Sequence, residues 1–169
     1  MEKSEQFYDA ENKLKAYDEE TRNLMAKALN LDVIDFKNAF DESVYLPEIV
    51  YLLRRSFKER VTHLKVLGEK DMRSGTDVSS GFCMFASYLI YSMTGGDKIW
   101  ELRGTNLHWW LYHKQTQTVF DITRSQFPKE DLSEIYAMGQ PVKKLKKDEL
   151  FYDVLKAKAK ILAQRAGLE

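Results

Sequence analysis

Apolar residues in the first part of the chain recur with the period of an amphipathic α-helix. Over residues 5–30 they are spaced three and four apart, which places them on one stripe. A second helix is expected over 33–42, with Asp32 as its N-cap. A third begins near Pro47, a residue suited to a first helical turn, and ends at Gly68. The apolar stripe of this third helix is Val50, Leu53, Phe57, Val61 and Leu64.

Residues 69–81 lack any such period and are rich in Ser, Gly and Asp, which is typical of a loop. The next segment, 82–93, is apolar on nearly all sides and stops at Gly95 and Gly96. A helix that is apolar all round is covered by other elements on every side. We therefore expect this segment to be the central helix of the fold.

The pattern then changes to that of β-strands. Bulky, aromatic and β-branched residues fill 98–102, 108–113 and 118–122. The polar segment 114–117 separates the last two strands and indicates a hairpin. A short helical patch is expected over 131–138, and a last helix over 147–166. The stripe of that last helix is Phe151, Leu155, Lys158 and Leu162.

These elements predict an α+β fold in a single domain, 1–169, with neither a repeat nor a linker. A helical N-terminal part covers 1–68, a core covers 69–145, and a C-terminal helix covers 146–169. In the core, the central helix packs against a small antiparallel sheet built from residues 98–122. Helices of the first 67 residues cover that core.

Three residues of the core are suited to acid–base chemistry: Cys83 at the start of the central helix, His108 and Asp121. A thiol becomes a good nucleophile when a helix N-terminus and a neighbouring imidazolium lower its pKa. Strand alternation puts His108 on the face of Trp110. A hairpin loop of even length pairs Trp110 with Asp121, so that Asp121 lies diagonal to His108 and can orient its ring. A loop of odd length would shift this pairing.

Each of these residues also has a plain structural interpretation. A free cysteine commonly packs in a core, a histidine on a strand can bond to the backbone, and an aspartate can close a turn. Gln126 is a weaker candidate as an oxyanion or amide donor, and Trp110 as the wall of a substrate groove. His63 is expected at the surface or in a helix cap, and His113 is expected to be exposed.

The same residues resemble a known group of enzymes. The pieces Gly81-Phe82-Cys83, His108-Trp109-Trp110 and the run from Asp121 to Phe127 are similar to the papain-like and transglutaminase-like cysteine-enzyme superfamily, nearest to the small bacterial YunG-like family. The resemblance covers residues 79–145. It implies a papain-like core with a Cys83 nucleophile, a His108 base and an Asp121 orienting group. Papain-like proteases carry a glutamine six residues before the cysteine, where this chain has Asp77, which counts against peptidase activity.

Composition narrows the class of protein. The chain is 44% hydrophobic and 12% aromatic, which excludes disorder, and its net charge of zero argues against a nucleic-acid binder. A single cysteine forms no internal disulfide and no cysteine-based zinc site, which fits the cytoplasm or a delivered effector. The sequence predicts neither a signal peptide nor a membrane span, and no metal or cofactor.

The sequence therefore predicts a thiol-dependent acyl-transfer enzyme acting on a protein, peptide or other amide. Attack by Cys83 on a carbonyl gives one acyl-enzyme, and the acceptor then decides between peptidase, glutamine deamidase and transglutaminase-like outcomes. The alternative is a catalytically silent protein-interaction module on the same fold, with its helical first half as the binding surface.

Overall fold

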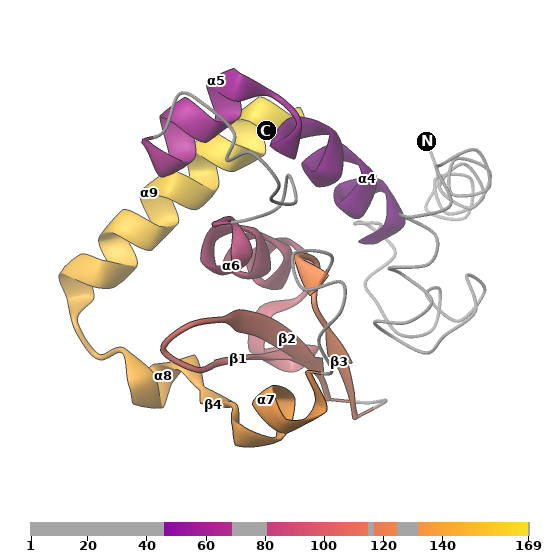
Figure 1. The fold of residues 1–169 in the computed structure, drawn as a ribbon, viewed down its shortest axis with the longest axis vertical. Helices are drawn as coiled ribbons and strands as arrows, with labels where there is room; N and C mark the ends of the chain where they lie inside the picture. The colour runs from indigo at the N-terminus through magenta and orange to yellow at the C-terminus, as the bar shows by residue number, and fades with distance from the viewer. Residues whose placement is uncertain (1–45, 69–80, 115–116, 125–131, 169) are drawn as a thin grey trace.

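The computed structural model describes residues 46–68, 81–114, 117–124 and 132–168. The helices expected over 5–30 and 33–42, the loop over 69–80 and Gln126 lie outside these residues. The described part is an α+β arrangement of helices around one small sheet (Figure 1). No helix in it is long and apolar enough to cross a membrane.

The sheet is antiparallel and has four strands in the order β3-β2-β1-β4. The strands are β1 (Trp100–Gly104), β2 (Trp109–His113), β3 (Thr118–Phe120) and β4 (Gln140–Pro141). The first three confirm the predicted strands to within two residues at each end. The pattern missed β4, because a strand of two residues that includes a proline shows no period of two.

Helix α6 (Cys83–Met93) is the central helix, as predicted. It lies between the sheet on one side and the helices α4 (Leu46–Phe57) and α9 (Glu149–Ala166) on the other (Figure 1). Ala86, Leu89 and Ile90 of α6 are buried in the main core. Because neighbours cover α6 on several sides, its sequence is apolar almost all round rather than along one stripe.

The last helix buries a row of small side chains. Leu155 and Leu162 of its predicted stripe are buried, and so are three alanines that the stripe did not include: Ala159, Ala163 and Ala166. Alanine lets helix backbones approach closely, and α9 packs against α6, α4 and η2. Lys158 of the predicted stripe donates a hydrogen bond to the carbonyl of Lys65 at an exposed position, 3.2 Å away.

The third predicted helix is interrupted. α4 ends at Phe57, and a short helix α5 (Arg60–Thr62) leads into the π-helical turn η2 (His63–Leu67). Val61 and Leu64 are 45% and 42% exposed, so the prediction of one continuous stripe is wrong there. The break and the wide π turn rotate the later residues away from the 3.6-residue period, and Thr62, His63 and Val66 face inward instead.

Two histidines expected at the surface are buried. His63 lies against the Phe82 ring, and its Nε2 is 2.7 Å from the carbonyl oxygen of Phe57, so it caps the end of α4. For His63 the surface prediction is wrong and the capping prediction is right. His113 is fully buried, with its ring edge-on to Trp100, because its face of β2 is the one that the α6 core covers.

Helix α7 (Ser133–Met138) covers the opposite face of the sheet, below it in Figure 1. Its Tyr136 packs edge-on against the Trp110 ring, with centroids 5.0 Å apart. The chain then passes Gly139, enters β4 and continues through α8 (Val142–Leu145) to α9. The guanidinium of Arg103 donates to the Gly139 carbonyl at 2.7 Å, which ties this crossing to β1.

Gly139 is a position where any side chain would collide with Trp110. A Cβ there would lie 2.7 Å from Cη2 of the Trp110 ring and closer still to its Cζ2. We expect Gly139→Ala to lower the free energy of unfolding by about 1–3 kcal/mol, the usual cost of overpacking. Urea denaturation measures it, with Gln140→Ala, a change of the exposed neighbour, as the control. Equal stability of the two variants would contradict this packing.

Candidate active site

Cys83 is the first residue of α6, and its side chain is half-buried. Gly81 precedes the helix with φ of 87°, a left-handed conformation that favours glycine. The N-cap position is occupied by Phe82, without a side-chain cap. The first N–H groups of a helix have no acceptor within it, so the thiol lies beside backbone donors that α6 itself does not pair and beside the positive end of the helix dipole. The expected capping residues, Ser79 and Ser80, lie outside the described residues.

His108 is held at the start of β2 by the turn that joins β1 to β2. The Thr105 amide donates to the His108 carbonyl at 2.9 Å, and the Thr105 hydroxyl accepts from the His108 amide at 3.3 Å. Gly104 is required there, because a Cβ would lie 2.8 Å from the His108 carbonyl oxygen. The His108 side chain is almost fully buried.

Asp121 directly follows β3, and the hairpin register brings it to His108. The ladder pairs Leu111 with Phe120, so Trp110 and Asp121 are the next opposite positions, as the even loop predicted. The ring nitrogen Nε2 of His108 lies 2.7 Å from Oδ2 of Asp121, and both side chains are about 3% exposed. The same-face placement of these two residues is confirmed.

The Asp121 carboxylate is held by further donors. Its Oδ1 accepts from the Thr123 amide at 3.1 Å and from the Thr123 hydroxyl at 3.3 Å. Its Oδ2 accepts from the Tyr136 hydroxyl at 2.7 Å. A buried carboxylate needs such partners to replace the water it has lost, and here they also fix its orientation.

Sequence reasoning missed Tyr136. It lies within the short helical patch predicted over 131–138, and nothing in the local pattern marks its hydroxyl as the partner of a buried carboxylate. Its contact with Trp110 depends on the crossing at Gly139, which brings α7 under the sheet. Burial raises the pKa of Tyr136, as do the charge of Asp121 and the hydrogen bond to it, so Tyr136 stays protonated and donates.

Cys83 interacts with the pair of His108 and Asp121. Burial alone lowers the pKa of His108, but a hydrogen bond to Asp121, another to Cys83 and the charges of both outweigh it and raise the pKa to about 9. Because Nε2 faces the carboxylate, Nδ1 is the ring nitrogen left for the thiol. The structure therefore brings Cys83, His108 and Asp121 together from α6, the start of β2 and the end of β3.

The two weaker candidates have different outcomes. Trp110 is fully buried between the rings of His108 and Tyr136, with centroid distances of 5.8 and 5.0 Å. It therefore packs against the site residues and has no exposed surface for a substrate to contact. Gln126 lies outside the described residues. In the described part of the chain, no group of three His, Cys, Asp or Glu side chains could hold a metal ion.

Comparisons with protein-family models, with curated proteins and with solved structures give no match for this chain. The α+β class is shown by the structure itself. The functional argument therefore depends on the geometry of these side chains.

The hydroxyl of Tyr136 should contribute measurably to stability. Tyr136→Phe removes a charge-assisted hydrogen bond to a buried carboxylate, and we expect a loss of about 1.5–3 kcal/mol in the free energy of unfolding. The control is Tyr152→Phe, whose hydroxyl donates to the neutral carbonyl of Lys146 at an exposed position. Chemical denaturation measures the free energy of unfolding of both variants. A larger loss of this free energy for Tyr152→Phe than for Tyr136→Phe would refute the role given to Tyr136.

The raised pKa of His108 makes stability depend on pH. The protonated ring is favoured in the folded protein, so protonated His108 stabilises the fold. This stabilisation is complete below about pH 6.5, the ordinary pKa of a histidine. It is lost as the pH rises through about 9. We expect the free energy of unfolding of the wild type to fall over this interval relative to that of His108→Gln. If the free energies of unfolding of the wild type and His108→Gln changed equally between pH 6 and 9.5, His108 would gain no proton affinity on folding.

Proposed function

We propose that this protein is a thiol-dependent acyl-transfer enzyme that uses a Cys83-His108-Asp121 triad. One observation carries the proposal: three residues from three separate segments meet, with His108 bonded to Asp121 at 2.7 Å and interacting with the half-exposed thiol of Cys83. A cysteine that served packing alone would need neither the buried imidazole nor the buried carboxylate, both of which are costly to desolvate.

In the first step the imidazole of His108 takes the thiol proton, and Sγ of Cys83 attacks the carbonyl carbon of the substrate. The C–S bond forms while the carbonyl π electrons move to oxygen. The N–H groups at the start of α6, which have no acceptor within the helix, are the proposed donors to the oxyanion that results. Gln126 remains a proposed second donor.

In the second step the tetrahedral intermediate collapses. The bond to the leaving amine breaks, and the His108 imidazolium gives its proton to that amine. A water or amine acceptor, deprotonated by His108, then attacks the acyl carbon, and the thiolate of Cys83 leaves. Water on a peptide gives a peptidase, water on a glutamine amide gives a deamidase, and an amine gives a transglutaminase-like transfer.

Asp121 holds the imidazole in the orientation that this sequence of steps needs, and its charge stabilises the imidazolium. Tyr136 acts as a positioning residue, because it bonds the same carboxylate oxygen as His108 and so fixes where that oxygen lies. The arrangement supports the proposed place of the chain in the papain-like and transglutaminase-like superfamily. It also suits a reducing compartment such as the cytoplasm, where the thiol stays free.

The test is the rate of Cys83 alkylation by iodoacetamide as a function of pH. We expect His108→Ala to slow alkylation near neutral pH by about tenfold or more, because the base that assists thiolate formation is gone. Asp121→Asn should have an intermediate effect, since the ring loses its orienting charge. The control is His113→Gln, which removes a buried imidazole from the opposite face of β2.

Identical pH profiles for the wild type and His108→Ala would end the triad assignment and favour the silent interaction module. An effect of His113→Gln as large as that of His108→Ala would show that the loss reflects destabilisation. In addition, Cys83→Ser should keep the melting temperature of the wild type. A clearly lowered melting temperature would identify Cys83 as a packing residue, because a hydroxyl is costly in an apolar core.

A further inference from the structure

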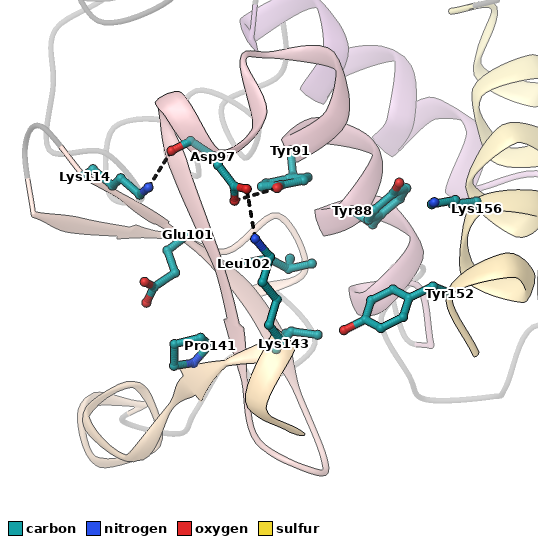
Figure 2. Close-up of a pocket in the computed structure, with 11 residues that line it drawn as sticks. Tyr88, Tyr91, Asp97, Glu101, Leu102, Lys114, Pro141, Lys143, Tyr152 and Lys156 are labelled. Carbon is teal, nitrogen blue, oxygen red and sulfur yellow. Dashed lines mark hydrogen bonds and ion pairs between the residues drawn. The ribbon is translucent and has the colours of Figure 1, made fainter. Parts of the chain in front are cut away.

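A hollow lies beside the apolar cluster that Cys83 contacts. It has a volume of about 580 Å³ and is formed by α6, β1, α8, α9 and the turns that follow α6 and β2 (Figure 2). The cluster of Trp109, Val142 and Leu155 packs against Cys83 and also against Tyr88, Leu102 and Tyr152 of the hollow. None of the three proposed triad residues lines this hollow.

The helix geometry separates the two sites. Tyr88 lies five residues after Cys83 on α6, which at 1.5 Å per residue is about 7.5 Å along the axis. Tyr91 lies one turn further and shares the face of Tyr88, so both rings line the hollow. A volume of this size is typical of a small-molecule site.

Aromatic rings and a lysine meet at one end of the hollow. Tyr88 of α6 and Tyr152 of α9 lie near Lys156, and the apolar side chain of Leu102 lies beside them (Figure 2). Tyr152 is held in place, because its hydroxyl donates to the Lys146 carbonyl at 2.7 Å. Two rings on rigid helices form a ready surface for a flat apolar group.

The charges at the rim leave a positive excess. Asp97 is paired with Lys143 at 2.9 Å and accepts from the Tyr91 hydroxyl at 2.6 Å. Glu101 is paired with Arg103 at 3.3 Å. Lys114 donates to the main-chain carbonyl of Asp97 and also interacts with the charge of the Asp97 carboxylate. Among the described residues Lys156 has neither an ion-pair nor a hydrogen-bond partner. Both acids are thus paired with cations, while Lys156 is not.

We propose that this hollow binds a small aromatic carboxylate, with its ring between Tyr88 and Tyr152 and its carboxylate on Lys156. The single ammonium group of Lys156 matches one carboxylate, and the apolar surface of the hollow matches a flat aromatic ring. A phosphate would require the several N–H donors or arginines that such groups recruit. The pair of Lys143 with Asp97 crosses the middle of the hollow, and both side chains are more than half exposed, so it yields to a ligand at little cost (Figure 2).

The probe for the test is 2-naphthoate, titrated into the ¹⁵N-labelled protein and followed by amide chemical shifts. We expect shifts to centre on Tyr88, Leu102 and Tyr152, and the dissociation constant to rise about tenfold or more in Lys156→Glu. The matched control is Lys160→Glu, an exposed lysine one turn further along α9 that does not line the hollow. Tyr152→Leu, which removes one ring but no charge, should also weaken binding.

Absence of shifts up to about 5 mM 2-naphthoate would overturn the proposal, since millimolar affinity is the least that a built site provides. Equal affinity of Lys156→Glu and Lys160→Glu would overturn the role of Lys156. Binding of the neutral 2-naphthamide as tightly as 2-naphthoate would overturn the choice of an anionic ligand. Because Lys156 is exposed, its replacement leaves the core intact, and unchanged amide shifts away from the hollow verify this.

Discussion

The buried carboxylate of Asp121 is the constraint around which one face of the sheet is organised. It is 2% exposed, and a charge in that position is stable only when hydrogen-bond donors replace the water it has lost. His108, Thr123 and Tyr136 supply those donors from the start of β2, the turn after β3 and α7. Three parts of the chain are thereby fixed relative to one another, which is what a catalytic site requires of its positioning groups.

The packing near this carboxylate follows from the same requirement. Tyr136 reaches Asp121 only because α7 lies close under Trp110, and that approach requires a residue without a side chain at Gly139. The Trp110 ring fills the space between Tyr136 and His108 and keeps water from the ion pair. A dry surrounding strengthens the bond between His108 and Asp121 and raises the cost of losing either partner. Trp110 therefore serves the site by excluding solvent.

The local period was sufficient to predict the central helix and the hairpin face, although it failed at Val61 and Leu64. Alternation along 108–113 and an even loop predicted the face shared by His108 and Asp121, and uniform apolarity predicted α6 as the central helix. It was insufficient where distant elements decide. His63 is buried because the π turn η2 directs it inward, and His113 is buried because the α6 core covers its face of β2. β4 is a strand only because β1 lies beside it. Tyr136 carries no local signal, since its partner Asp121 lies fifteen residues away in the sequence.

Both proposed sites draw residues from one buried element, helix α6. Neighbours on several sides fix its position, so the thiol at its first residue and the tyrosines on a later turn both lie on a rigid support. Only the N-terminal end of a helix has backbone N–H groups without an acceptor inside the helix, and this end of α6 carries the cysteine. The later turns have all their amides bonded within the helix and can contribute side chains alone, which suits an aromatic wall but not an oxyanion site. The position of each residue along α6 thus decides which chemistry it can support.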